Sequence, residues 1–220
     1  MLRVNNLIGF GVSGARDIVP TDDGDAAASS GLPGTIVTWT SASTTGPHSY
    51  ALLTYDDGTD AITVSSATWG VEACSILEQA QPASGATTGA AILYCAGAQT
   101  GDLVITFSGD VPEAEITKVS LANVVDPDTP VDTDELTSTS ATSFDLAALS
   151  SPGAGGIRLA VFAHRDDPNT VTWTNASEIS DLDVGGYQHS AAYDLGDDAT
   201  TINASISGAN RGSLVGVSLR

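Results

Sequence analysis

Apolar and polar positions alternate along most of this chain, in short runs rich in Val, Ile, Thr and aromatic residues. Gly, Asp, Pro and Ser residues separate the runs. An alternation of period two places one face of a strand in a core and the other in solvent. The strands predicted on this basis are Thr35–Trp39, Tyr50–Tyr55, Ala61–Trp69, Ala90–Ala96, Asp102–Ser108, Ala114–Val124, Ser143–Ala147, Ile157–His164, Thr170–Ala176, His189–Leu195, Thr201–Ser207 and Ser213–Leu219.

Helical periodicity is nearly absent from the chain. The segment Val71–Gln81 is predicted to be a further strand, with one short helix as the alternative. Many short strands joined by turns rich in Gly, Pro, Ser and Thr are typical of an all-β sandwich. We therefore expect an all-β fold, with a β-sandwich that is jelly-roll-like or Ig-like.

The predicted strands contain an internal repeat, because the same residues recur in the same order about 98 to 110 positions later. The matches include Tyr-Asp-Asp at 55–57 with Arg-Asp-Asp at 165–167, Ile62–Ala67 with Val171–Ala176, and Val119-Ser-Leu121 with Val217-Ser-Leu219. A chance match of turn residues is the alternative, but the common order favours duplication. Each copy has about the length that a small sandwich needs.

The repeat divides the chain into four parts. Residues 35–125 and 143–220 are the two predicted sandwich repeats. Residues 126–142 hold two prolines and several carboxylates, and such a segment is predicted to be an extended acidic linker. Residues 1–34 are predicted to be an extended N-terminal arm followed by a flexible spacer.

The charge of the chain excludes one class of partner. There are 27 Asp plus Glu residues against 7 Lys plus Arg, so the formal net charge is −20, and nucleic acid is not expected to bind. Hydrophobic residues make up 41 % of the chain, enough for a core of Ala, Val, Ile and Leu. No continuous apolar run reads as a membrane span or a signal peptide, so we expect neither.

Motifs of enzymatic sites are missing from the sequence. No Gly-x-Ser-x-Gly elbow occurs, and His48, His164 and His189 have no metal-ligand spacing, so we expect them at the surface or at strand ends. The chain is therefore not expected to be an enzyme. Cys74 and Cys95 are predicted to be buried reduced thiols, with a disulfide as the alternative.

Acidic loops and one tryptophan are the candidates for ligand binding. Asp56, Asp57 and Asp60 place carboxylates close together in a loop, as calcium requires, but without the full register of a calcium loop. We expect no cofactor, with calcium as the alternative. Trp69 ends a predicted strand and is the candidate for an exposed ring that stacks on a sugar, whereas Trp39 and Trp173 are predicted to be core residues.

The N-terminal arm is the candidate for interaction with a partner. Its apolar residues Leu7, Ile8, Phe10 and Val12 have no evident strand partner within the repeats, and the arm is slightly positive while the rest of the chain is strongly negative. Docking on a neighbouring subunit is one interpretation, and addition of an edge strand to its own sandwich is the other.

The degenerate sandwich repeats resemble virion structural proteins of tailed bacteriophages, in strands such as Leu103–Gly109 and in the terminal run Gly212–Leu219. The start Asn5-Asn-Leu-Ile-Gly-Phe-Gly11 is similar as well. The resemblance implies a non-enzymatic capsid decoration, cement or head-spike protein, assembled in the host cytoplasm and displayed on the virion. Its implied partners are the major capsid protein or other virion proteins and, as a homo-oligomer, further copies of itself. The alternative is a carbohydrate- or receptor-binding module of a tail fibre or cell-surface protein, using Trp69 and the acidic loops.

Overall fold

The computed structural model describes residues 18–27, 32–56, 61–81, 88–165, 170–184, 187–195 and 200–220. Every regular element in this part of the chain is a β-strand, so the predicted all-β class is confirmed. The strands are β1 (Val19–Ala27), β2 (Gly34–Ser43), β3 (His48–Asp56), β4 (Val64–Trp69), β5 (Glu72–Ala80), β6 (Thr88–Ala96), β7 (Thr100–Val111), β8 (Glu113–Ala122), β9 (Asp132–Leu146), β10 (Ile157–Arg165), β11 (Thr172–Thr174), β12 (Ser177–Asp183), β13 (Tyr187–Asp194) and β14 (Ile202–Leu219). The segment Val71–Gln81 is a strand, as predicted, whereas β1 and β12 were not predicted.

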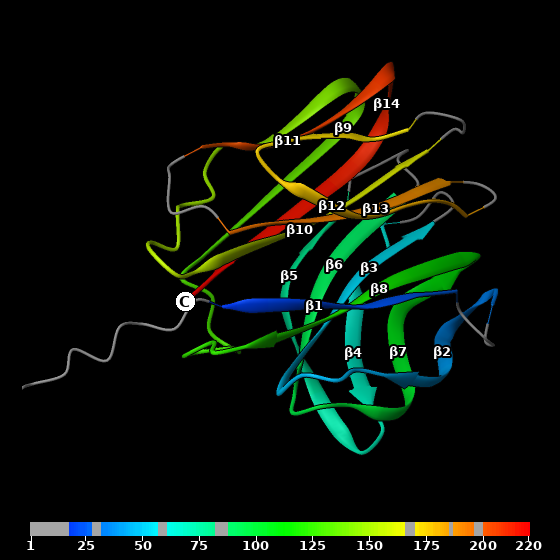
Figure 1. Ribbon diagram of the computed structural model, residues 1–220. Coiled ribbons are helices and arrows are strands. Elements are labelled where there is room, and N and C mark those ends of the chain that lie inside the picture. Colours follow the sequence, from blue (N-terminus) through cyan, green and yellow to red (C-terminus); the bar gives the residue numbers. More distant parts are fainter. Residues whose placement is uncertain are drawn as a thin grey trace, which may run out of the picture.

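The strands β1 to β8 form a sandwich with the strand order of a jelly roll (Figure 1). One sheet has the order β1-β8-β3-β6, and the facing sheet has the order β2-β7-β4-β5. β5 belongs to both sheets, because its first residues pair with β4 and its later residues pair with β6. Side chains from both sheets, among them Trp39, Leu53, Leu93 and Ile105, fill the space between them.

The strands β9 to β14 repeat this arrangement with fewer strands, two of which, β9 and β14, are longer than any strand of the first sandwich. β10 lies between β13 and β14, as β3 lies between β6 and β8. β9 takes the places of β1 and β2, because its first part pairs with the end of β14 and its last part pairs with the start of β14. The segment predicted as two strands, Thr201–Ser207 and Ser213–Leu219, is therefore one strand with bulges, which serves both sheets of the second sandwich.

The two sandwiches share a hydrophobic core between them, in addition to the core inside each. Leu53 of β3 points into the first sandwich, while its neighbour Leu52 lies in the shared core together with Val161 of β10. Phe162, next to Val161, points into the second sandwich. Strands buried on both faces have nearly continuous apolar sequences, as β3, β6 and β10 do. The molecule is thus a block of four β-layers with the shared core at its centre (Figure 1).

Strand partners define the register of the repeat. Ser49 of β3 and Arg158 of β10 pair with equivalent residues on both of their neighbouring strands. Ser49 and Arg158 are therefore equivalent positions in the two copies of the repeat. Tyr55 then corresponds to His164, whereas the sequence match sets it beside Arg165. That match is wrong by one residue, and in a strand a shift of one residue exchanges the two faces.

Two segments predicted to be linkers or spacers contain strands. Most of the acidic segment 126–142 belongs to β9, and the carboxylates of Asp132 and Asp134 accept hydrogen bonds from the backbone of Ser150 and Ala148. Within the predicted spacer 1–34, β1 pairs along its length with β8. Carboxylates on the solvent face of an edge strand give a linker-like composition, which is why composition alone was misleading.

Cys74 and Cys95 form a disulfide between β5 and β6, with 4.4 Å between their Cα atoms. The prediction of reduced thiols is therefore wrong. In the second sandwich the place of Cys95 is taken by Asp194, which forms an ion pair with the buried Arg158. The same position of the fold is thus held by a disulfide in the first sandwich and by an ion pair in the second.

Candidate functional site at the seam between the sandwiches

The sandwiches lie close together along one side of their shared core and apart along the other. The backbones of β5 and β6 lie close to those of β9, β10 and β14, whereas within the described residues the backbones of β1 and β8 do not come comparably close to those of β12 and β13. We call the side bounded by β1, β8, β12 and β13 the open seam. β1 and β12 are the outer strands of their sheets, so a strand edge borders the open seam on each side.

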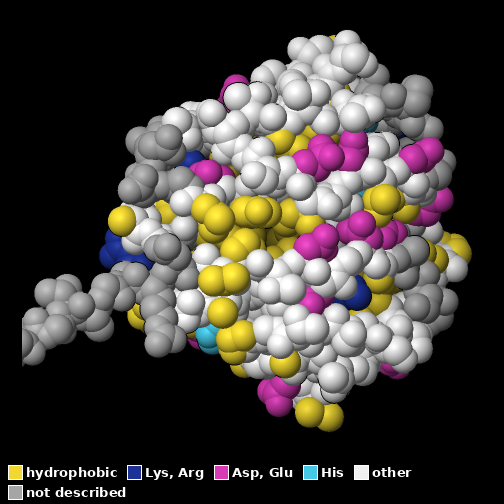
Figure 2. All heavy atoms as spheres, viewed as in Figure 1, with side chains coloured by type: hydrophobic (Ala, Val, Ile, Leu, Met, Phe, Trp, Pro, Cys, Tyr) yellow, Lys and Arg dark blue, Asp and Glu magenta, His cyan; other side chains and the backbone are white. Residues whose placement is uncertain are grey.

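The open seam is apolar where β1 begins. Ile18 is buried in the shared core, and Ile179 of β12 and Tyr193 of β13 pack against that core while remaining half-buried. Val19 and Leu195, at the same end of the strands, are 54 % and 48 % exposed. Figure 2 shows hydrophobic side chains gathered on the surface between β13 and β1. This end of the seam is a strip of apolar surface that solvent reaches.

Farther along the seam, a chain of polar side chains joins the two sandwiches around His189. The Nδ1 atom of His189 lies 2.7 Å from the Oγ1 atom of Thr54, and its Nε2 atom lies 2.7 Å from the Oγ1 atom of Thr117. Thr117 in turn donates its hydroxyl to Asp25 over 2.6 Å. The hydroxyl of Tyr187 donates to the backbone oxygen of Thr54 over 3.1 Å. Four strands, β1, β3, β8 and β13, meet in this network.

One arrangement of protons satisfies the imidazole of His189. Because Thr117 donates to Asp25, its oxygen accepts a hydrogen bond from Nε2–H. In the neutral ring Nδ1 then accepts the proton of Thr54 over 2.7 Å, so Thr54 does not at the same time donate to the hydroxyl of Tyr187, which lies 3.3 Å away. Burial favours this neutral form of the ring by lowering the pKa of His189 to about 3. Burial likewise raises the pKa of Tyr187 well above its usual range. The centre of the network is therefore uncharged at neutral pH.

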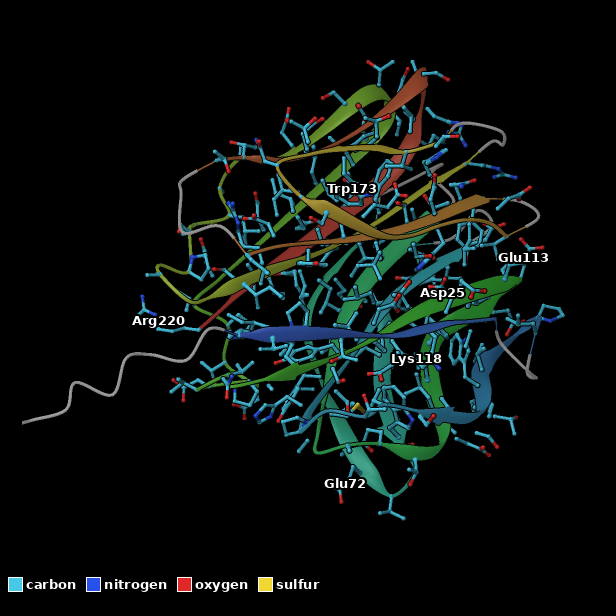
Figure 3. The ribbon with its side chains drawn as sticks, viewed as in Figure 1. Asp25, Glu72, Glu113, Lys118, Trp173 and Arg220 are labelled. Atoms are coloured by element: carbon cyan, nitrogen blue, oxygen red, sulfur yellow. A yellow bond between two sulfur atoms is a disulfide. The ribbon has the colours of Figure 1, made fainter. Side chains whose placement is uncertain are left out.

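Carboxyl groups surround this network. Burial raises the pKa of Glu115 to about 7, and the charge of Asp25 adds to the shift. The pKa of Glu113 is also raised, by burial and then by the charges of Asp56 and Asp183. Figure 3 places Asp25 and Glu113 toward the same end of the molecule, opposite the end that carries Arg220. The open seam thus runs from an apolar end to an acidic end.

The hydrogen bonds of this network link the two sandwiches, and its side chains are placed for a structural role. Hydroxyl and imidazole groups act in nucleophilic catalysis when the hydroxyl can reach a substrate. The side chains of Thr54, Thr117 and His189 are all fully buried, and the hydroxyl of Thr117 is committed to Asp25. What the open seam offers from outside is an apolar strip beside a strand edge, a surface that fits an extended segment of polypeptide.

Trp69 lies inside the first sandwich. Its side chain is 0 % exposed, and its Nε1–H donates to the backbone oxygen of Ala42 over 3.1 Å. The prediction of an exposed stacking ring is wrong, because Trp69 belongs to the inward set of β4 together with Val64 and Ala67. Trp39 is buried in the same core, as predicted, and Trp173 is half-buried against the core of the second sandwich.

Several predicted site residues fall outside the part of the chain that the structure describes. They are Asp57 and Asp60 of the calcium candidate, and Leu7, Ile8, Phe10 and Val12 of the arm. Asp56 lies half-buried at the end of β3. Among the described residues, no group of three or more His, Cys, Asp or Glu side chains is placed to hold a metal ion.

Sequence reasoning missed the residues of the polar network. His189 and His164 were expected at the surface or at strand ends. His164 lies at the end of β10, as expected, although it is fully buried, whereas His189 is fully buried within β13. Thr54 and Thr117 lie far from His189 in the sequence. The available signal was a polar residue inside an otherwise continuous apolar run, since such a residue needs a partner when it is buried.

Within the described ranges there is no helix of the length and apolarity needed to cross a membrane. Comparisons of this chain with protein-family models, with curated proteins and with solved structures found no match.

Proposed function

We propose that this chain is a non-enzymatic structural protein of a bacteriophage virion, a capsid decoration or head-spike protein that docks on the particle. Docking occurs through the residues that precede β1 or through one face of the first sandwich. The observation that carries the proposal is the fusion of two jelly-roll sandwiches through a shared core. Jelly rolls recur in viral capsid domains, and a fused pair is a stiff building block.

The charge of the molecule supports display on the outside of a particle. A net charge of −20 keeps copies hydrated and apart from one another, and it gives no advantage to a surface that faces packaged DNA. Within strands such as β3 and β6 the buried residues are almost all uncharged, so the charge lies on the surface. A block of this kind binds a symmetric particle through many identical weak contacts.

The disulfide supports the same proposal. Disulfides persist in oxidising surroundings and are rare in reducing cytosol. The bond between Cys74 and Cys95 is therefore suited to a protein that spends its working life on a released particle. The burial of Trp69 removes the ring on which the carbohydrate-binding alternative depended.

The test is whether the chain is part of purified particles. Particles released from the source culture would be banded in a density gradient, and quantitative mass spectrometry would measure the number of copies per particle. We expect many copies per particle. Recovery of the chain only in the soluble fraction would contradict the proposal.

A second measurement locates the docking surface. The full chain with Leu7, Ile8 and Phe10 replaced by Ser is expected to bind particles that lack the protein at least tenfold more weakly. The matched control is Val71→Ser, which changes a 96 % exposed apolar residue at the far turn between β4 and β5 and is expected to leave binding unchanged.

A further inference from the structure

Two carboxyl groups at the acidic end of the open seam lack hydrogen-bond donors. Glu115 of β8 is only 4 % exposed, and no hydrogen bond joins its carboxyl group to any residue that the structure describes. Glu113, two residues earlier, has a buried Oε2 atom that is also without a partner within the described ranges. Buried carboxyl groups are normally bonded to donors, so an unpartnered one marks a place where a donor from outside the chain can bind.

Both carboxyl groups point from β8 toward the second sandwich. Thr117 gives the direction, because its hydroxyl lies 2.7 Å from Nε2 of His189 across the seam. Residues 113, 115 and 117 lie on the same face of the strand, since side chains alternate along it. Burial raises the pKa of Tyr187, which belongs to β13, and the charges of Glu115 and Glu113 add to the effect. The two carboxyl groups therefore face the seam.

Asp25 of β1 connects this buried site with the surface. Asp25 is exposed, and its carboxylate accepts the hydroxyl of the buried Thr117 over 2.6 Å. Burial raises the pKa of Glu115 and the charge of Asp25 adds to the shift, so these two carboxyl groups lie near each other. Figure 2 shows acidic side chains on the surface between β13 and β1. Asp25 thus marks the outer side of the site, and Glu115 marks its inner side.

The surroundings of the site add negative charge. Asp56 lies opposite Glu113 on β3, and Asp56 and Asp183 of β12 both add to the raised pKa of Glu113, after the larger effect of burial. Lys118 follows Thr117 in the sequence and therefore points to the opposite face of β8. Figure 3 places Lys118 on the other side of β1 from Asp25. The site combines an excess of acidic groups with unpartnered acceptor oxygens, and a ligand that fits it is a cation with several donors.

The guanidinium group of arginine meets this requirement. It carries a permanent positive charge and five N–H donors in one plane, so it can bond to two carboxyl groups at once. A metal ion fits less well, because no three His, Cys, Asp or Glu side chains of the described residues are placed to hold one. Val19, at the apolar end of the seam, is six residues before Asp25 on β1, a distance of about 20 Å along a strand. An extended segment with an apolar residue and an arginine six positions apart matches both ends.

We propose that Glu115, Glu113 and Asp25 bind the guanidinium group of an arginine that belongs to a partner protein. The arginine is carried by an extended segment that lies along the open seam and covers the apolar strip near Val19 with an apolar residue. This inference names the kind of partner that the seam recognises, and it does not depend on the proposed virion role.

A consequence of this binding is the release of a proton. The pKa of Glu115 is about 7, so near neutral pH many chains carry a proton on this carboxyl group. A bound guanidinium favours the ionised carboxylate, and the proton leaves to the solvent. Tyr187 and His189, which face the site from β13, do not take it up, because burial raises the pKa of the first and lowers that of the second to about 3. The affinity should therefore rise about tenfold between pH 6 and pH 8.

Calorimetric titration of the full chain with two peptides tests the proposal. The first peptide is acetyl-Leu-Ser-Thr-Ser-Thr-Ser-Arg-amide, and the second has citrulline, which is similar in shape and uncharged, in place of arginine. Each is titrated into the wild-type chain, Glu115→Gln and Glu72→Gln. Glu72→Gln is the matched control, because it removes the same charge at an exposed residue that Figure 3 shows far from the seam. Should Glu115→Gln not fold, as judged by its melting curve, Glu113→Gln takes its place.

The arginine peptide is expected to bind wild type and Glu72→Gln equally and Glu115→Gln about tenfold more weakly or less well still. The citrulline peptide should bind wild type as weakly. Titrations at pH 6 in buffers of different ionisation enthalpy should show close to one proton released per peptide by wild type and none by Glu115→Gln. Equal affinity of Glu115→Gln and Glu72→Gln would show general attraction to an acidic molecule and would overturn the proposal. Equal binding of the two peptides, or no measurable binding of the arginine peptide, would overturn it as well.

Discussion

Two buried titratable residues of the open seam give the stability opposite dependences on pH. Glu115 has a pKa of about 7 in the folded chain against an ordinary value of 4.5, so between these values the folded chain keeps a proton that the unfolded chain has released. Its contribution to the free energy of unfolding is full below pH 4.5 and is lost as the pH rises through 7. His189 has a folded pKa of about 3 against 6.5, so its contribution is lost as the pH falls from 6.5 toward 3.

Replacing Glu115 separates the two effects. Relative to Glu115→Gln, the wild-type chain is expected to lose about 3 kcal/mol of unfolding free energy as the pH rises from 4.5 to 8. Urea denaturation at a series of pH values measures this difference. Val71→Ser, at a 96 % exposed residue, removes no titratable group, so this control should differ from wild type by a constant amount. A constant difference for Glu115→Gln as well would contradict the account.

Trp69 is a packing residue, and its replacement is expected to reduce stability. Trp69→Ala removes a fully buried indole and should lower the free energy of unfolding by about 3–5 kcal/mol. Trp69→Phe keeps most of the volume and loses the hydrogen bond to Ala42, so it should cost less. Chemical denaturation of both variants checks the order, and a stable, well-folded Trp69→Ala protein would contradict it.

At the scale of elements, the disulfide ties β5 to β6 where β5 leaves one sheet and joins the other. A thiol titration in denaturant is expected to find no free thiol. Replacing Cys74 and Cys95 by Ala together should lower the free energy of unfolding by about 3 kcal/mol, because the closed loop of some twenty residues no longer restricts the unfolded chain. Two titratable thiols in the wild-type protein would show that the bond is absent.

Element type was largely predictable from the sequence, because short alternating or continuous apolar runs leave little choice except strands. β1 and β12 were not predicted, since their sequences, Val-Pro-Thr-Asp-Asp and Ser-Glu-Ile-Ser-Asp, are those of outer strands that bury little. Such strands depend on pairing with a neighbour, which local sequence does not reveal. The sequence alignment of the two copies is wrong by one residue at Tyr55 for a similar reason. It matches residues of the turns that follow the two strands, whereas the true correspondence depends on how the strands pair.

The candidate site could not be predicted from the sequence, because it depends on the packing of two sheets. His189, Thr54 and Thr117 come from three strands, and only the meeting of the sandwiches brings them together. The open seam and the opposite side of the shared core also differ only because of how the two sandwiches pack together, which local sequence does not show. The alternation of apolar and polar residues indicated many buried positions, although not those of Trp69 and His189, and it did not indicate which of the buried faces is shared.

At the scale of the whole molecule, the two sandwiches are expected to behave as one cooperative unit. Leu52→Ala opens a cavity in the shared core and should cost about 2–5 kcal/mol. Because the shared core belongs to both sandwiches, amide exchange should accelerate in strands of both, including β7 and β14. Leu195→Ala, at an exposed position, is the control and should leave exchange unchanged. Acceleration confined to the first sandwich would contradict a shared core.

Differential scanning calorimetry of the full chain tests the fused block most directly. The shared core predicts a single endotherm whose calorimetric and van't Hoff enthalpies agree, because neither sandwich can unfold without exposing the apolar face of the other. Two resolved endotherms, or a calorimetric enthalpy about twice the van't Hoff value, would show that the sandwiches are independent domains and would contradict the account.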